Sequence, residues 1–498
     1  MKLGVNLLAG LANSVWTALI GLAVVPVYLK YLGIEAYGLI GFFATTQAVL
    51  SLLDMGMAPT INREVARCSA LGNLKEAGKL LHTLAVVYWC MAGIIALIVF
   101  ALAPLIAEFW LQSKQLSAQT ISHAVMLMGL VVACRWPIGL YQGALIGAQR
   151  LAVSSGINIV MATIGSLGAV AVLAFVSPTI EAFFIWQACM GLVTAVIMRS
   201  GAWRVIGKMT EIRFDAKKLK SIWRFSAGMS GIALSAILFT QLDKIILSKT
   251  LGLEEFGHYM LATVVVSGLY LLIMPTYNTI YPRLSALVAV NDIEKLTELY
   301  RLGTRSLATI LFPISMMLIV FAEDLVYLWT GNPAIAAKVA PVISLLAIGT
   351  ALHGIMFFPF ALQLAYGKTR LPLTINSLLM VVLVPLTIFL SIQYGAIGGA
   401  MAWLVLHVLY ILLGTWLTHR QLLKEIGMIW LFQDVAVPLG VTVLVGIVAL
   451  NAMNIVNYPA NINLIFGVVS TLVAIALSFA TMPKKLQSIL LRAIKCKI

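Results

Sequence analysis

Long apolar stretches alternate with short polar breaks along the whole chain. A helix that crosses a bilayer needs about 20 consecutive apolar residues, and roughly 14 stretches approach that length. They lie near residues 4–29, 37–61, 81–106, 120–147, 152–176, 180–198, 223–247, 256–280, 302–322, 335–364, 371–392, 395–418, 432–453 and 462–481. Turn-forming residues such as Gly33, Pro178 and Gly395 stand at the breaks. The pattern predicts an all-α polytopic membrane protein with about 14 transmembrane helices.

The composition excludes several other classes of protein. Of 498 residues, 61% are hydrophobic and 10% are charged, whereas soluble domains average about 45–50% apolar and about 25% charged residues. A soluble enzyme, a secreted disulfide scaffold and a disordered protein are therefore excluded. The five cysteines lie outside the predicted outer loops, so no disulfide framework is expected. The sequence has no zinc-type Cys/His cluster and no Walker loop, so we expect neither a metal site nor a bound cofactor.

The net charge of +15 is distributed unevenly between the two sides of the predicted membrane. Of the 33 Lys and Arg residues, 27 fall in segments on the side that holds the N-terminus, and four fall on the opposite side. Arg135 and Lys244 remain within spans. Cytoplasmic segments carry an excess of Lys and Arg, so both termini are predicted to be cytoplasmic. The charge is mostly a topology signal, and no nucleic-acid partner is expected.

A short motif occurs twice, about half the chain apart. Residues 31–38 read Tyr-Leu-Gly-Ile-Glu-Ala-Tyr-Gly, and residues 250–257 read Thr-Leu-Gly-Leu-Glu-Glu-Phe-Gly. A chance match is one explanation, but each copy follows the first helix of a half, which favours duplication. Helices 1–6 and 7–12 are then parallel repeats, and a substrate site is expected between them. The predicted division is an N-terminal six-helix lobe at 1–198, a basic cytoplasmic linker at 199–222, a C-terminal six-helix lobe at 223–418, and two extra helices with a basic cytoplasmic tail at 419–498.

Arg135 lies about midway along the fourth predicted span. Ionisable residues at such depth are expensive and usually functional. A guanidinium is always charged, and its planar fork grips phosphate through two parallel hydrogen bonds. Substrate contact is therefore one interpretation. The other is a buried ion pair that fixes helix packing, with Asp54 as the candidate partner.

Two carboxylates are candidates for ion coupling. Asp243 lies toward the outer end of the seventh span, after Gln241 and before Lys244. Neighbouring helix positions point about 100° apart, so Asp243 and Lys244 are not expected to face one another. Asp243 can carry a proton or bind Na⁺, or it can simply lie at the membrane interface. Asp54, in the inner third of the second span, is the other candidate.

His353 and His407 lie near the middle of the tenth and twelfth predicted spans. Packing through hydrogen bonds is favoured for both histidines, with a proton relay as the alternative.

Several motifs together resemble one known family. The run through Tyr31–Gly38 to Asp54-Met55-Gly56 and Asn62-Arg63-Glu64 is similar to bacterial polysaccharide (O-antigen, Wzx-type) flippases of the multidrug/oligosaccharidyl-lipid/polysaccharide exporter superfamily. Further matches are Val25-Pro26, Tyr141-Gln142-Gly143-Ala144-Leu145, Gln149-Arg150, Gln241-Leu242-Asp243-Lys244 and Leu328-Trp329-Thr330-Gly331-Asn332. The resemblance extends over most of the chain, and the plan of 12 + 2 helices agrees with it.

The resemblance implies a flippase in the bacterial inner membrane. Its substrate would be an undecaprenyl-diphosphate-linked oligosaccharide, moved from the inner to the outer leaflet by alternating access for surface polysaccharide biosynthesis. A proton or sodium gradient would drive the cycle. A polysaccharide polymerase and a chain-length regulator are candidate protein partners, beside the lipid bilayer.

The resemblance also assigns roles to individual residues. Arg135 and Lys244 would attract the diphosphate, with Gln241 beside Lys244, and Asp54 or Asp243 would couple protonation to the motion. Because only two basic residues are counted within spans, a strongly cationic cavity must also recruit a helix-end residue such as Arg63.

Two competing functions share parts of this pattern. A cation-coupled multidrug exporter of the same superfamily has the same topology, but it needs an acidic, aromatic cavity, whereas the deepest charge here is Arg135. A membrane polymerase or ligase usually carries catalytic groups on a large outer loop. The longest outer segments here, near 107–119 and 323–334, are short, so we do not expect an enzyme.

Overall fold

The computed structural model describes residues 2–54, 56–207, 214–215, 234, 237, 239–424, 426–427, 429–455 and 459–495. Apart from one bridge between Gln112 and Gly252, the described residues form no β-structure. Ten of their helices are long and apolar enough to cross a membrane, or eleven if the bent pair Leu253–Ser267 and Tyr270–Ala289 is one span. The prediction of an all-α chain with many apolar spans is confirmed. The number 14, the parallel repeats and the side of the termini stay predictions.

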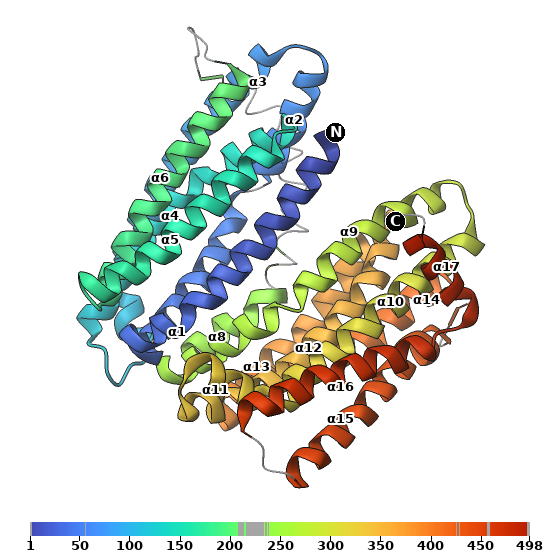
Figure 1. The fold of residues 1–498 in the computed structure, drawn as a ribbon. Helices are drawn as coiled ribbons and strands as arrows, with labels where there is room; N and C mark the ends of the chain where they lie inside the picture. The colour runs from blue at the N-terminus through green and yellow to red at the C-terminus, as the bar shows by residue number, and fades with distance from the viewer. Residues whose placement is uncertain are drawn as a thin grey trace. The chain divides into compact units, whose positions relative to one another are not determined.

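The first compact unit comprises Met1–Gly257. Its α4 lies between α3 and α6, while α5 covers α1 and α6 (Figure 1). The elements are α1 (Lys2–Leu50), a 3₁₀ turn (Ser51–Asp54), α2 (Met57–Ala70), α3 (Leu74–Leu105), η2 (Ile106–Trp110), α4 (Ala118–Gly147), α5 (Leu151–Phe175), α6 (Ile180–Ile206) and the start of α8 (Leu253–Ser267). Most of the predicted linker 199–222 and the start of the span 223–247 lie outside the described residues.

The second compact unit comprises His258–Ile498. Its α12, which is buried over much of its length, packs against α9, α10, α11 and α13. The elements after α8 are α9 (Tyr270–Ala289), α10 (Ile293–Val320), α11 (Ala322–Thr330), α12 (Pro333–Ala365), α13 (Arg370–Leu409), η3 (Tyr410–Gly414), α14 (Thr415–Leu422), η4 (Trp430–Ala436), α15 (Val437–Ile455), α16 (Ala460–Ala480) and α17 (Lys484–Lys495). The four-part division of the chain predicted above stays a prediction.

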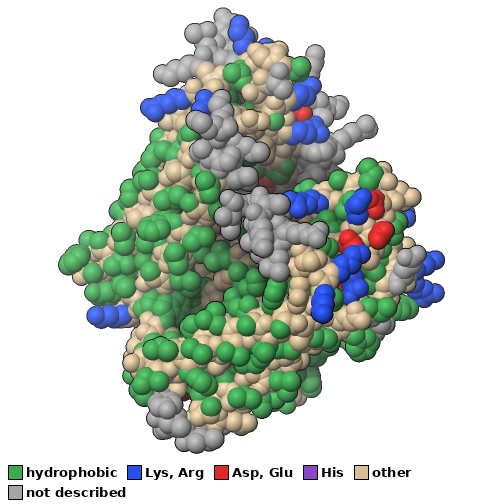
Figure 2. Space-filling model, turned by 45° about the vertical axis from the view of Figure 1, so that its right-hand side comes forward, with side chains coloured by type: hydrophobic (Ala, Val, Ile, Leu, Met, Phe, Trp, Pro, Cys, Tyr) green, Lys and Arg blue, Asp and Glu red, His purple; other side chains and the backbone are tan. Residues whose placement is uncertain are grey.

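Hydrophobic side chains cover the flanks of the helices on the face shown in Figure 2, and basic side chains gather toward helix ends. Apolar residues such as Leu97, Val381 and Val448 are more than 60% exposed. Exposed apolar surface of this extent is suited to contact with lipid chains rather than with water.

Two predicted helix breaks are single-residue kinks rather than loops. Gly33, inside α1, has φ 79°, and Gly395, inside α13, has φ 58°. Glycine adopts these positive φ values without the steric cost that a Cβ atom imposes. The sequence therefore located both breaks, but the chain turns within one residue at each.

The two copies of the repeated motif cross inside the first unit. A Cβ atom on Gly38 would lie 2.5 Å from the carbonyl oxygen of Leu253, and one on Gly257 would overlap the carbonyl oxygen of Ile34. Gly38 matches Gly257 and Ile34 matches Leu253 in the two copies, so the contact is reciprocal. The backbones approach this closely only because both crossing positions are glycine.

One basic residue of the predicted cytoplasmic side is buried within the fold. Arg305 lies inside α10, which begins at Ile293, and its side chain is fully buried. Its guanidinium donates to the carbonyl of Gln433 and to the hydroxyl of Thr481, both at 2.7 Å. The number of basic residues within spans stays a prediction. Arg305 joins α10 to the two last apolar helices.

The glycine crossing gives a test of the fold. Replacing Gly38 by Ala should lower the apparent melting temperature of the purified protein, because the new Cβ overlaps the Leu253 carbonyl and overpacking costs about 1–3 kcal/mol. Gly93→Ala in α3 is the matched control, since nothing lies within 4 Å of the added Cβ. Equal melting temperatures for the two variants would contradict the close crossing.

Candidate functional site

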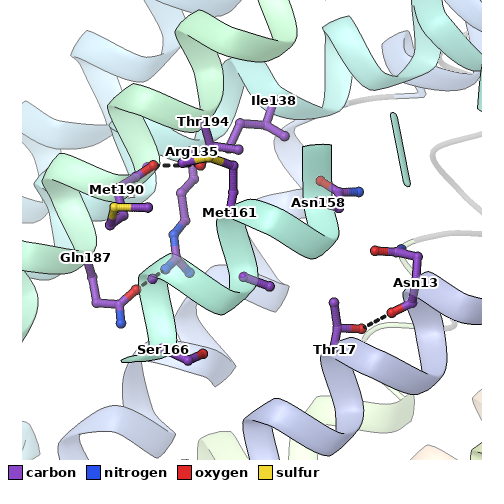
Figure 3. Close-up of a pocket in the computed structure, with 13 residues that line it drawn as sticks. Asn13, Thr17, Arg135, Ile138, Asn158, Met161, Ser166, Gln187, Met190 and Thr194 are labelled. Carbon is purple, nitrogen blue, oxygen red and sulfur yellow. Dashed lines mark hydrogen bonds between the residues drawn. The ribbon is translucent and has the colours of Figure 1, made fainter. Parts of the chain in front are cut away.

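A cavity of about 340 Å³ lies within the first unit, among α1, α4, α5 and α6. Its apolar lining comes from Ile138, Met161 and Met190, together with two glycines. The polar lining residues come from all four helices (Figure 3), namely Asn13, Thr17, Arg135, Asn158, Ser166, Gln187 and Thr194. The cavity thus combines one cation with several neutral hydrogen-bonding groups.

Arg135 supplies the only ionic charge among the described lining residues. Its guanidinium donates to the amide oxygen of Gln187 at 2.5 Å and to that of Gln47 at 3.4 Å. It also lies over the ring of Phe43, 5.6 Å from the ring centroid. No carboxylate of the described residues forms a salt bridge with it. Amide oxygens orient the fork but carry no net charge, so the cavity keeps an uncompensated positive charge.

The packing of α4 against α6 positions this side chain. An added Cβ at Gly191 on α6 would lie 3.0 Å from Cγ of Arg135. The glycine therefore leaves the space through which the stem of Arg135 passes toward Gln187, one turn earlier on α6 (Figure 3). A larger residue at position 191 would displace the guanidinium from the cavity.

Asp54 has contacts other than the predicted one. The hydroxyl of Tyr88 donates to its Oδ1, and the backbone N–H of Ala58 donates to its Oδ2 at 3.2 Å. Asp54 thus holds the first turn of α2. The ion pair with Arg135 that the sequence left open is not formed between these two described residues.

Asp243 and Lys244 do face one another, so the prediction that they would not is wrong. Lys244 Nζ lies 3.1 Å from each carboxylate oxygen of Asp243 and donates to the carbonyl of Thr240 at 2.9 Å. The predicted 100° applies to the Cα–Cβ directions, but the long lysine stem curls back along the helix. Asp243 is buried, and Gln241 is half-buried beside it.

The other predicted residues do not line the cavity around Arg135. Arg63 is exposed at the surface and forms a 2.8 Å ion pair with Glu64. Lys244, Gln241, Asp54 and Asp243 are also outside the described lining. The structure therefore brings together Asp243 with Lys244, and it places Arg135 apart from both.

The neutral polar residues of the cavity were missed by the sequence argument. Asn13 and Thr17 are four residues apart on α1, and Gln187 and Thr194 are seven apart on α6. Such spacings put side chains on one helix face. Polar residues repeated on one face of an apolar span were the available signal.

The two histidines that the sequence singled out are hydrogen-bonded within the second unit. His353 Nδ1 lies 2.7 Å from the hydroxyl of Tyr270, and His407 Nδ1 lies 2.8 Å from the carbonyl of Trp403. These contacts agree with the packing interpretation. A proton relay stays a prediction.

Comparisons with known proteins agree with the fold. The sequence matches the model of the polysaccharide biosynthesis protein family over residues 30–333. It is 22% identical over 428 residues to a putative O-antigen transporter of Shigella flexneri, which covers 82% of this chain and 97% of that protein. It is 25% identical over 410 residues to the teichuronic acid biosynthesis protein TuaB of Bacillus subtilis, covering 80% and 78%.

The fold is similar to the solved structure of the lipid II flippase MurJ in an inward closed conformation. The TM-score is 0.69 at 14% identity, and the match covers 95% of this chain and 99% of that one. With its many apolar helices the chain is a multi-pass membrane protein. The match over residues 30–333 spans more than half of the sequence, and the chain therefore belongs to the polysaccharide biosynthesis protein family.

Proposed function

We propose that the chain is a flippase for undecaprenyl-diphosphate-linked oligosaccharide repeat units. It moves them from the inner to the outer leaflet of the bacterial inner membrane by alternating access, for surface polysaccharide biosynthesis. The family membership and the names of the two relatives support a role in polysaccharide transport. The observation that carries the proposal is Arg135, a cation without a described carboxylate partner in a polar cavity.

The cavity suits the head group of such a lipid. A diphosphate presents paired oxygens to a guanidinium fork, and charge-assisted bidentate contacts are among the strongest hydrogen bonds in proteins. Gln187 and Gln47 orient the fork without neutralising it. The neutral groups of Asn13, Asn158 and Thr194 match the donors and acceptors of sugar hydroxyls. The Oδ1 atom of Asn13 is buried without a described partner, so it can accept such a hydroxyl.

The size of the cavity limits what it holds. At about 340 Å³ it is at the lower end of the usual range for small-molecule sites. It accommodates phosphate and the adjoining sugar, while the polyprenyl chain stays in the bilayer. Lys244, Gln241 and Arg63 would then contact the substrate only in another conformation or at another stage.

A proton or sodium gradient would drive the cycle through Asp54 or Asp243. Protonation of Asp243 would remove the charge that Lys244 faces at 3.1 Å, which frees this cation for an anionic substrate. Protonation of Asp54 would weaken its hold on the first turn of α2. Each event couples one proton to a local rearrangement.

The finer architecture is part of the same proposal. We expect about 14 spans, two parallel six-helix repeats with two extra helices, and cytoplasmic termini. No catalytic group, metal or bound cofactor is required. A polysaccharide polymerase and a chain-length regulator would act on the delivered substrate. A multidrug exporter is disfavoured because no acidic residue is among the described lining residues of the cavity.

Removal of Arg135 tests the site. Arg135→Ala should reduce surface polysaccharide by at least about tenfold in a complementation assay, because a lost charge-assisted hydrogen bond costs about 1.5–3 kcal/mol. Arg135→Lys should keep partial function, since it retains charge but loses the fork. Membrane levels are measured by immunoblot, and Arg204→Ala, which removes an exposed cation from α6, is the control. Normal export by Arg135→Ala would refute the phosphate contact.

Ion coupling is tested by transport into sealed inverted vesicles. Collapse of the proton or sodium gradient should reduce flux in the unaltered protein. Asp243→Asn should give a lower flux that no longer responds to the gradient, because its site cannot titrate. Asp54→Asn is assayed in parallel, and Asp292→Asn, at the surface end of α10, is the control. A flux that ignores both gradients would remove Asp54 and Asp243 from this role.

A further inference from the structure

A second cavity lies in the second unit, at the end of α14, and it has a volume of about 360 Å³. It is lined by Thr415, Trp416, His419, Arg420, Lys424 and Gly427. It is separate from the cavity around Arg135, which is built from α1, α4, α5 and α6 of the first unit. The transport proposal makes no use of it.

The mouth of this cavity carries two cations and an aromatic ring. Arg420 and Lys424 are exposed, and neither forms a salt bridge with a carboxylate of the described residues. The Arg420 guanidinium lies over the ring of Trp416, 5.4 Å from its centroid. A guanidinium that stacks on an aromatic ring is attracted through its flat face. Its N–H donors lie in the plane of the guanidinium, so they remain available to another acceptor.

Hydrogen bonds hold the buried histidine of this cavity. His419 Nδ1 lies 3.0 Å from the carbonyl of Gly427, and its Nε2 lies 2.9 Å from the hydroxyl of Tyr300. A carbonyl only accepts, so Nδ1 donates there, and a neutral ring then accepts from Tyr300 at Nε2. The Tyr300 ring in turn stacks on Trp430. Both nitrogens of the buried histidine are hydrogen-bonded, which fixes the orientation of its ring.

An apolar stripe leads along the helix to these cations. Four large apolar side chains are 39–50% exposed at spacings of three or four residues, namely Val405, Val408, Leu412 and Trp416. Arg420 follows Trp416 by four residues and is also exposed. Spacings of three and four put side chains on one helix face. The stripe lies within the apolar candidate span Arg370–Leu422, and the cations lie at its end.

This arrangement matches the two parts of a phospholipid. An acyl chain fits an exposed apolar stripe, and a phosphate fits a pair of cations at interfacial depth. Basic pockets at the cytoplasmic ends of transmembrane helices suit anionic head groups, and Arg420 and Lys424 belong to the charges that predict the cytoplasmic side. We propose that the α14 cavity binds the head group of an anionic glycerophospholipid of the inner leaflet, whose acyl chain lies along the stripe from Trp416 to Val405.

Native mass spectrometry of the full-length protein in neutral detergent tests this proposal, with phosphatidylglycerol and phosphatidylcholine as probes. Phosphatidylglycerol should bind more tightly, and Arg420→Gln/Lys424→Gln should weaken its binding by about tenfold or more, since each interfacial cation contributes about fivefold. The matched control is Lys368→Gln/Arg370→Gln, which removes two exposed cations from the same predicted side. Melting temperatures without lipid check that both double variants are folded.

Each outcome decides for or against the lipid site. Selective loss of phosphatidylglycerol in the Arg420/Lys424 variant, with the control unchanged, supports it, and Trp416→Gln should then weaken binding as well. Equal binding of the two lipids, or equal losses in both double variants, overturns it. Competition by millimolar inorganic phosphate, with no effect of Trp416→Gln, would assign the cavity to a soluble anion and also overturn the proposal. Transport activity is not the readout, so failure here is distinct from failure of the flippase assignment.

Discussion

Within hydrocarbon there is no water to hydrogen-bond the backbone, and this constraint governs where the charged side chains of the chain lie. Every break in a helix must find a partner for its N–H and C=O groups inside the protein. Glu35, which is buried, accepts the backbone N–H groups of Lys114 and Gln115 at 3.1 and 3.0 Å. Asp54 accepts the N–H of Ala58, and Arg305 donates to the carbonyl of Gln433 within a π-helical turn. These three charged side chains, of which Glu35 and Arg305 are buried and Asp54 is half-buried, bond backbone groups where helices are irregular or begin.

Arg135 differs from these residues in what it faces. Lys244 is neutralised by Asp243 at 3.1 Å, and Arg301 by Asp434 at 2.7 Å. Arg135 instead meets two glutamine oxygens, which satisfy hydrogen bonds but leave the charge uncompensated. A buried charge without a counter-ion destabilises the folded protein, because its lost hydration is not replaced. An anionic ligand would offset this cost. This difference in partners, rather than depth alone, distinguishes Arg135 from Lys244 and Arg301.

The sequence predicted what depends on local pattern. Apolar stretches located the long helices, and Gly33 and Gly395 marked the kinks, because helix length and positive φ are properties of a few neighbouring residues. It also singled out Arg135. It could not predict that Asp54 would contact Tyr88, that Lys244 would curl back to Asp243, or that Asn13, Asn158 and Thr194 would meet in one cavity. The Asp54 contact and the meeting of the cavity residues depend on how separate helices pack, and the Lys244 contact depends on the conformation of a long side chain. Spacing along one helix does not specify either.

The partners of the basic residues, which the sequence does not reveal, divide these residues into two groups. A cation whose described partner is a carboxylate or a backbone carbonyl, as at Arg301 and Arg305, has its interaction completed by the fold. A cation oriented by neutral amides or by an aromatic face, as at Arg135 and Arg420, is held in place but has no carboxylate partner among the described residues. The positive-inside rule requires only that Lys and Arg lie on the cytoplasmic side of the membrane. It does not require their side chains to be held in one orientation. An oriented cation without a carboxylate partner that also lines a cavity, as at Arg135 and Arg420, therefore marks a position where an anion from outside the chain is expected.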